Sequence, residues 1–330
     1  MRGGLHDRVS LVCLLQLNPV SGLLVSLVVL VASPAPGGVA GEQPLRSTRT
    51  LGTGGDVLLY SISGISVDKR NNVYVTDLLD YSVKKFDRSG VCVGKVGRRG
   101  TGPGEFRSPA FSMLTGERLI VLQMEDPRIQ VFDTGLVFRG GFIVPGGMPV
   151  DITPVWPRGM AIALYGDSSH GVVLRYDGTE GRSPQRIPLE PTGKGHPLYA
   201  ASRIAVCHDG TLVVAYLFMN RVELYSREGR LLRRFSVGGM VSEGGEEDDR
   251  QVPQRTYFRK VLLDAAGNIL LLGGNQAPHP GRDIFVRRRD GSSIHTFVLP
   301  SRTRLIAAGE NHALYATDEG GTRVERYILR

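Results

Sequence analysis

Cysteine and tryptophan are scarce in this chain of 330 residues, which has three cysteines and one tryptophan. Three cysteines cannot form a disulfide framework, so a buried core must hold the fold together. Only one apolar stretch, near the N-terminus, approaches the length of a bilayer crossing, and this excludes a multi-spanning membrane protein. Glycine, by contrast, is abundant: its 43 copies are nearly twice the usual share of about 7%. The composition therefore predicts a turn-rich globular domain.

The first forty residues have the pattern of an export signal. Two arginines precede an apolar stretch over 9–32, and the small residues at 38–40 suit cleavage by a signal peptidase before Gly41. A retained membrane anchor over the same apolar stretch is the alternative. We expect residues 1–40 to be a signal peptide or N-terminal membrane anchor and 41–330 to form the folded domain. The expected location is the periplasm, the extracellular space or a membrane-anchored position.

The charge of the domain is basic. Without residues 1–40 the chain keeps 38 Lys and Arg against 31 Asp and Glu, a net charge of +7. Outside the cytoplasm, a basic surface favours acidic ligands or acidic partner proteins over nucleic acid. Membrane contact is expected only through the N-terminal segment, if it is not cleaved. Cys92 and Cys207 lie in apolar runs and are expected to be buried free thiols.

The same order of strand-like segments recurs from Gly64 to the C-terminus. The first copy has four segments of alternating β-branched and aromatic residues bounded by Asn, Asp and Gly, which predicts four strands joined by tight turns. The second of these strands, Val73 to Asp77, recurs at Arg118 to Gln123, Gly159 to Tyr165, Thr211 to Leu217, Asn268 to Gly273 and Ala313 to Thr317. The average spacing of about 48 residues suits a four-stranded propeller blade.

The last copy ends after its third strand, which would leave an open sheet edge. The segment Arg49 to Gly55 resembles Val96 to Gly102, where the fourth strand of the first copy ends. We therefore expect Leu45 to Leu51 to pair beside Val324 to Leu329. The predicted fold is an all-β, six-bladed β-propeller of four-stranded blades, closed by the N-terminal strand that completes the last blade.

The first copy resembles a known repeat. Gly64-Ile-Ser-Val-Asp, Asn72-Val-Tyr-Val-Thr-Asp77, Val83-Lys-Lys-Phe-Asp87 and Gly100-Thr-Gly-Pro-Gly-Glu-Phe106 are similar to the NHL repeat of six-bladed β-propellers. The similarity is strong over Gly64 to Pro109 and weaker over the other blades. The resemblance implies the fold, but the fold hosts scaffolds, receptors and unrelated enzymes, so a site must be argued separately.

Ligand sites in propellers usually lie on the face where the loops between second and third strands, and the connections between blades, surround the central channel. We expect a ligand site among the polar residues of these loops: Asp77, Arg98, Arg99, Lys194, His196, Asn220, Asn275 and Asp318. The same face should also receive His170, His279, Glu319, Arg302 and Arg304. Asp77 also suits a second role, hydrogen bonding to its own loop.

A metal site is the alternative use of this face. His170, His196 and His279 are candidate zinc ligands, as in the amidating lyases whose propellers these repeats resemble, although loop-borne histidines without a spacing motif also fit a solvated role. The related lactonase and esterase propellers imply a Glu, Asn and Asp constellation instead, which Asp77, Asn220, Asn275 and Asp318 could form. Zinc or calcium belongs to this alternative only. The leading prediction needs no cofactor.

Other segments favour structural roles. The glycine-rich Gly100 to Gly104 lacks the following helix and Lys-Ser/Thr pair of a phosphate loop. The acidic run at 243–249 lacks calcium-loop spacing and fits a solvated loop. Arg287 to Arg289 is expected to be surface charge. Trp156 suits packing between blades as well as a ligand platform.

The chain contains no Gly-x-Ser-x-Gly or His-Glu-x-x-His motif. We therefore predict an exported, noncatalytic propeller that binds a partner protein or a small acidic ligand at the mouth of its channel. The alternative is a metal-dependent hydrolase or lyase of the propeller type, lactonase-like or amidating-lyase-like, that uses the same face.

Overall fold

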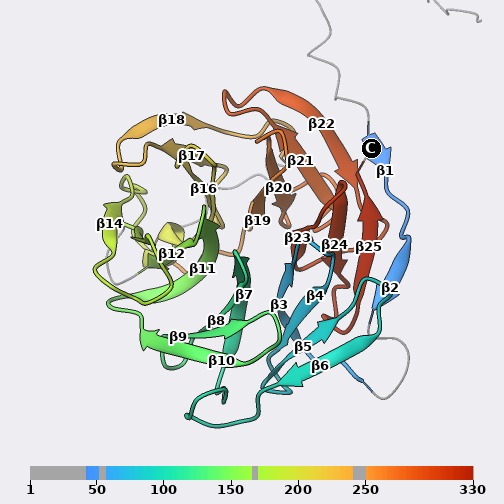
Figure 1. The fold of residues 1–330 in the computed structure, drawn as a ribbon. Helices are drawn as coiled ribbons and strands as arrows, with labels where there is room; N and C mark the ends of the chain where they lie inside the picture. The colour runs from blue at the N-terminus through green and yellow to red at the C-terminus, as the bar shows by residue number, and fades with distance from the viewer. Residues whose placement is uncertain (1–41, 52–56, 166–169, 241–249, 330) are drawn as a thin grey trace, which may run out of the picture. The chain divides into compact units, whose positions relative to one another are not determined.

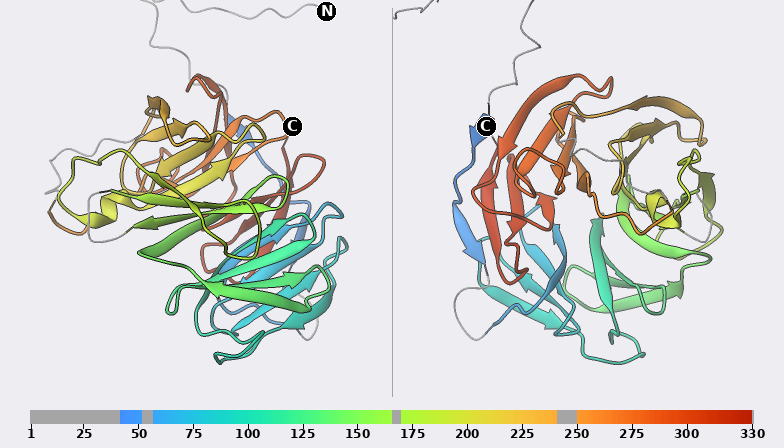
Figure 2. Two further views of the ribbon diagram at one scale, coloured as in Figure 1. Left: turned by 60° about the vertical axis from the view of Figure 1, so that its left-hand side comes forward. Right: turned by 180° about the vertical axis from the view of Figure 1, so that it is seen from behind.

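The computed structural model describes residues 42–51, 57–165, 170–240 and 250–329. Within these ranges, 25 strands form six sheets that surround a central channel as the blades of a propeller (Figure 1). The right-hand view of Figure 2 shows the same ring from behind. No helix in the described ranges is both long and apolar enough to span a membrane. The predicted export signal at 1–40 and the acidic run at 243–249 lie outside the described residues.

The first three blades run in chain order. Their strands are β3 (Ile62–Val67), β4 (Val73–Asp77), β5 (Ser82–Phe86) and β6 (Cys92–Val96); β7 (Pro109–Thr115), β8 (Arg118–Gln123), β9 (Arg128–Asp133) and β10 (Phe138–Ile143); β11 (Met148–Val155), β12 (Gly159–Tyr165), β13 (Val172–Tyr176) and β14 (Gln185–Pro188). In each blade the first strand lies at the channel and the fourth at the outer edge (Figure 1).

The other three blades complete the ring. Their strands are β15 (Ser202–Val206), β16 (Leu212–Tyr216), β17 (Val222–Tyr225) and β18 (Leu231–Phe235); β19 (Phe258–Leu263), β20 (Ile269–Gly273), β21 (Asp283–Arg287) and β22 (Ser293–Val298); β23 (Ile306–Ala308), β24 (Ala313–Thr317) and β25 (Val324–Ile328), with β1 (Glu42–Pro44) and β2 (Arg49–Leu51) from the N-terminal part. A short 3-10 helix, η1 (Pro197–Ala200), precedes blade four. The predicted all-β propeller of six four-stranded blades is confirmed.

The N-terminal segment closes the ring, as predicted, but over fewer residues. Strand β2 pairs antiparallel with β25, with Arg49 opposite Arg326 and Leu51 opposite Val324. The prediction that pairing begins at Leu45 is wrong, because the chain first follows blade five. There β1 pairs in parallel with β22 and gives that blade a fifth strand, and the Leu45 side chain is buried between blades five and six.

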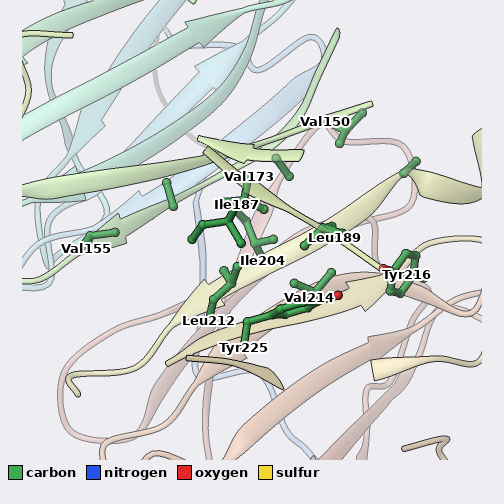
Figure 3. Packing of buried hydrophobic residues seen from close by; sticks show 13 residues of the cluster. Val150, Val155, Val173, Ile187, Leu189, Ile204, Leu212, Val214, Tyr216 and Tyr225 are labelled. Atoms are coloured by element: carbon green, nitrogen blue, oxygen red, sulfur yellow. The ribbon is translucent and has the colours of Figure 1, made fainter. Parts of the chain in front are cut away.

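The core lies between the blades. Among the described residues, six apolar clusters form, and each joins the facing sides of two neighbouring blades. Figure 3 shows the cluster between blades three and four, where Val173 and Ile187 meet Ile204 and Val214. Because successive side chains of a strand point to opposite faces, the middle strands are buried on both sides and read as continuous apolar runs.

Two smaller expectations had mixed outcomes. Cys207 is buried and Cys92 is half-buried, and both are free thiols. The assignment of Arg287 to surface charge is wrong: only 6% of the residue is exposed, and its guanidinium lies 5.3 Å from the centre of the Phe285 ring. Arg289 is partly exposed and pairs with Asp209 of the neighbouring blade at 2.5 Å.

We predict that Leu51→Ala lowers the free energy of unfolding by about 2–5 kcal/mol, the usual cost of truncating a buried leucine. Leu51 is 2% exposed and packs in the cluster between blades six and one. Thr50→Ala, on the exposed side of the same short strand, is the control and should change stability by less than about 0.5 kcal/mol. Urea unfolding measures both. An equal loss of unfolding free energy in the two variants would contradict the closure of the ring by β2.

Candidate functional site

The eight residues predicted to bind a ligand lie on the expected loops, but the described structure uses most of their side chains to build those loops. Asp77 ends β4 and is fully buried. Its carboxylate accepts hydrogen bonds from the backbone amides of Tyr60 at 2.9 Å and Ser61 at 3.0 Å, and pairs with the Lys84 ammonium at 2.7 Å. It therefore joins the chain that enters blade one to the second and third strands of that blade.

Lys84 is shared by two carboxylates. Its Nζ lies 2.6 Å from Asp80 as well as 2.7 Å from Asp77, and Lys95 also contacts Asp80 at 2.9 Å. Burial tends to raise the pKa of Asp80, but hydrogen bonds from Lys84, Ser82 and Lys95 outweigh it and lower the pKa to about 2. This loop is thus held by a compensated charge network rather than presenting an open acidic site.

Three other predicted residues stabilise loops in a similar way. Asn220 exchanges two hydrogen bonds with the backbone of Val237, at 2.8 and 2.9 Å. Asn275 accepts from the backbone amide of Thr256 at 2.7 Å, and Asp318 accepts from that of Thr322 at 2.7 Å. Each side chain supplies an acceptor for a loop amide that no strand satisfies.

The predicted basic residues and histidines are dispersed. Arg98 pairs with Glu105, and the Arg99 guanidinium lies over the Tyr81 ring. The Lys194 ammonium lies over the Tyr199 ring. His196 caps η1, and His279 contacts Asp283 through Nδ1 at 2.8 Å. His170 is exposed. The described residues contain no group of three or more His, Cys, Asp or Glu side chains placed to hold a metal ion.

A pocket of about 500 Å³ occupies the mouth of the channel. Its walls come from the first residues of the innermost strands and from the loops after second strands, and all six blades contribute. The lining is Ile62, Ser63, Leu78, Ser108, Ala110, Phe111, Met124, Asp151, Arg203, Leu217, Arg259, Lys260, Arg304, Leu305 and Glu319. None of the eight predicted ligand residues is among them, although Leu78 follows Asp77 and Glu319 follows Asp318 in the chain.

Three arginines of this pocket come from three successive blades. Arg203 and Arg259 are the second residues of the first strands of blades four and five, and Arg304 precedes the first strand of blade six. The Nε of Arg203 donates to the carbonyl of Arg259 at 3.0 Å, and Nη1 donates to the carbonyl of Val150. Arg259 donates to the carbonyl of Thr303 at 3.1 Å. These bonds fix the guanidinium groups of Arg203 and Arg259 to the backbone of neighbouring blades.

The arginine charges are not neutralised by carboxylates. Among the described residues, no ion pair includes Arg203, Arg259 or Arg304. Burial lowers the pKa of Arg259, and the charges of Arg302 and Arg304 lower it further, against the opposing effect of Glu319. Burial also lowers the pKa of Arg203, against the opposing effect of Asp151. An anion between these groups would relieve both penalties.

The acidic residues of the pocket are largely compensated by other groups. Asp151 is 1% exposed; its Oδ1 lies 2.7 Å from Lys260 Nζ, and its Oδ2 accepts from the amide of Ile204 at 3.0 Å. Glu319 is exposed and lies 3.5 Å from Arg302. Because Asp151 and Glu319 are paired with Lys260 and Arg302, the net charge at the channel mouth is positive and comes from Arg203, Arg259 and Arg304.

The part of the pocket lined by blades one and two is mostly apolar, with Ser63 and Ser108 as its polar residues. Blades one and two contribute Leu78, Ala110, Phe111 and Met124, whereas the arginines come from blades four to six. Figure 1 shows blades four and five across the channel from blades one and two, while blade six stands beside blade one. The pocket can therefore hold a molecule with an acidic group at one end and an apolar body at the other.

The sequence contains a signal for these arginines that loop-based reasoning missed. Each arginine stands at the start of a first strand, in Arg203-Ile-Ala-Val, Arg259-Lys-Val-Leu and Arg304-Leu-Ile-Ala. Arg304 and Glu319 were placed on the mouth face, but Asp151, Arg203, Arg259 and Lys260 were not. An arginine that recurs at or just before the start of the innermost strand in three consecutive repeats is the pattern that would have indicated the cluster.

Comparison with solved structures supports the fold. A streptogramin B lyase matches with a TM-score of 0.55 and 13% identity, over 86% of this chain and 87% of that chain. Regucalcin, a calcium-binding protein from Agrobacterium tumefaciens, matches with a TM-score of 0.56 and 13% identity, over 88% and 98%. A chain of a mitotic checkpoint complex matches with a TM-score of 0.54 and 11% identity, over 93% and 99%.

At these identities the likeness shows the fold alone, and the neighbours include enzymes as well as a component of a protein complex. No protein-family model matches the chain, and no curated protein sequence does. The function must therefore be argued from the residues of the site.

We predict that Asp77→Asn lowers the free energy of unfolding by about 3–5 kcal/mol, because it leaves Lys84 partly uncompensated in a buried site. Asp318→Asn is the control: Asp318 directly follows the second strand of blade six, but its side chain is partly exposed and bonds within its own turn. Its cost should be about 1 kcal/mol. Unfolding in guanidinium chloride measures both costs. If Asp77→Asn left the free energy of unfolding unchanged, the structural role of the Asp77 carboxylate would be contradicted and a ligand role would be favoured.

Stability should also depend on pH through Asp80. Its pKa is about 2 in the folded chain against an ordinary value of 3.8. The unfolded chain binds more protons between these values, so the contribution of Asp80 is complete above about pH 4 and is lost as the pH falls toward 2. Asp80→Asn should flatten the slope of unfolding free energy over this interval. If the unfolding free energies of the wild type and the variant changed in parallel with pH, the charge network around Asp80 would be contradicted.

Proposed function

We propose that the chain is an exported, noncatalytic β-propeller that binds a small acidic ligand at the mouth of its central channel. The observation that carries the proposal is the set of three arginines, Arg203, Arg259 and Arg304, which converge from successive blades without a carboxylate partner among the described residues. Arg203 and Arg259 are half-buried, and cations removed from water are normally paired, because desolvation of an unpaired charge is costly.

The pocket also defines the shape of the ligand. Guanidinium groups of fixed geometry suit a carboxylate, and the wall of Leu78, Phe111 and Met124 suits an aliphatic or aromatic body. Because Arg203 and Arg259 are already held by backbone carbonyls, little ordering entropy is lost when the ligand binds.

The cellular setting belongs to the same proposal. The apolar stretch at 9–32 and the small residues before Gly41 support export, with or without a retained anchor. The repeat pattern of blade one supports assignment to the NHL class of propellers. A basic domain outside the cytoplasm meets small organic acids and acidic partners rather than nucleic acid.

Hexanoate, with hexanamide as its neutral analogue, is a suitable probe for this pocket. We predict that the full-length protein binds hexanoate measurably more tightly than hexanamide in isothermal titration calorimetry. Arg304→Ala should weaken hexanoate binding by about tenfold, since a charge-assisted hydrogen bond contributes about 1.5–3 kcal/mol. Arg304 is exposed and its side chain makes no hydrogen bond among the described residues, so the variant should fold normally.

Arg107→Ala is the matched control, because it also removes one exposed arginine from the mouth face but does not line the pocket. It should bind hexanoate as the wild type does. Equal binding of hexanoate and hexanamide, or equal loss in both variants, would contradict the proposal. If hexanoate does not bind but a partner protein does, and Arg304→Ala abolishes that binding, the small-ligand proposal is contradicted. The ligand of the pocket would then be an acidic segment of the partner protein.

The metal-dependent hydrolase or lyase is tested separately. Element analysis by inductively coupled plasma spectrometry on purified, dialysed full-length protein measures bound zinc and calcium. Stoichiometric zinc that is lost in His196→Ala or His279→Ala would contradict the noncatalytic proposal and support an enzyme. For the binder we expect substoichiometric zinc and calcium, with hexanoate binding unaffected by the chelator EDTA.

A further inference from the structure

A second pocket lies at the other end of the blades. Its volume is about 310 Å³, and it is formed by the turns that join first to second strands and third to fourth strands in blades three and four. These turns lie on the face opposite the channel mouth, since strands alternate in direction. The lining is Val155, Trp156, Pro157, Arg175, Asp177, Cys207, His208, Asp209, Gly210 and Arg227.

Arg175 is the unusual residue of this pocket. It lies on β13, is 6% exposed, and uses Nη1 to donate to the carbonyl of Gly210 at 3.2 Å. Its Nε is buried and has no hydrogen-bond partner among the described residues. No ion pair of the described residues includes Arg175, so a buried cation is left with unused donors, which folded proteins ordinarily avoid.

The acidic neighbours do not neutralise this cation. Asp209 lines the pocket but pairs at 2.5 Å with Arg289, which is not part of the lining. Burial lowers the pKa of Arg175 and the charge of Arg227 lowers it further, while Asp177 and Glu228 act in the opposite direction. A carboxylate placed against Nε and Nη2 would satisfy the two nitrogens that Gly210 leaves unused, in the side-on geometry that guanidinium groups favour.

The rim of the pocket is aromatic and exposed. Trp156 is the single tryptophan of the chain and 68% of it is accessible. Its ring centre lies 5.8 Å from that of His208 on the facing turn of blade four. A large ring left exposed beside a pocket is typical of a stacking platform rather than of core packing.

We propose that this pocket is a second binding site, which takes a ring compound carrying a carboxylate group. The ring stacks on Trp156 and the carboxylate pairs with Arg175. A pocket of about 310 Å³ lies at the lower end of the range for small-molecule sites and fits one six-membered ring with its acidic substituent. The site is independent of the channel mouth, so neither proposal depends on the other.

Aromatic acids and sugar acids share this chemistry, and the test separates them. Because Trp156 is the only indole in the chain, its fluorescence reports on this pocket and not on the channel. Full-length protein, excited at the red edge of the indole band, is titrated with benzoate and with glucuronate, and in parallel with neutral benzamide and glucose. We expect a saturable change with at least one acid and none with its neutral analogue.

Arg175→Gln, which keeps a donor for Gly210 but removes the charge, should weaken that binding at least tenfold. Arg230→Ala removes an exposed arginine that lies on the same turn as Arg227 but outside the lining, and it should leave the binding unchanged, as should Arg304→Ala at the channel. No saturable change with either acid, an equal response to the neutral analogues, or undiminished binding in a folded Arg175→Gln would overturn the proposal.

If Arg175→Gln fails to fold, Trp156→Ala decides the question by calorimetry, because an exposed turn residue can be truncated without loss of the core. Loss of the acid's binding heat in this variant supports the site, and an unchanged heat overturns it.

Discussion

Each blade of this molecule depends on apolar contact with the blades beside it. A single twisted four-stranded sheet has two apolar faces, and here both are covered only because six such sheets stand in a ring among the described residues. Strand β4 shows the consequence: Tyr74 packs toward blade two while Val75 packs toward blade six. The ring must therefore be complete, and this requirement explains why the N-terminal residues return to blade six.

Ring closure also decides where chemistry is possible. The first strand of every blade faces the channel, so any polar residue at its start is brought close to the corresponding residues of the other five. Three of these starts carry arginine and two neighbouring blades carry apolar side chains, which makes one mouth both cationic and apolar. On the opposite face, turns from only two blades meet, and the pocket around Trp156 and Arg175 is smaller and more local.

Much of the fold could be predicted from the sequence, because the alternation around Val73 to Asp77 and its recurrence reflect burial on both sides of a strand. Strand β1 could not, since Glu42–Pro44 is three residues long and has no alternation. The loop residues were placed on the correct face, but the direction of their side chains depends on unsatisfied amides such as those of Tyr60, Thr256 and Val237. Those amides are not visible in a pattern, so residues that build loops were taken as ligand contacts.

The pairing of β2 with β25 has a consequence for synthesis. The hydroxyl of Thr48 donates to the carbonyl of Arg326 at 3.0 Å, across 278 residues. The ribosome makes one partner of this bond at the start of the domain and the other at its very end. Blades one to five obtain their four strands before blade six does, because blade six needs Val324–Ile328 as the partner of β2, so the ring stays open until that strand has been made.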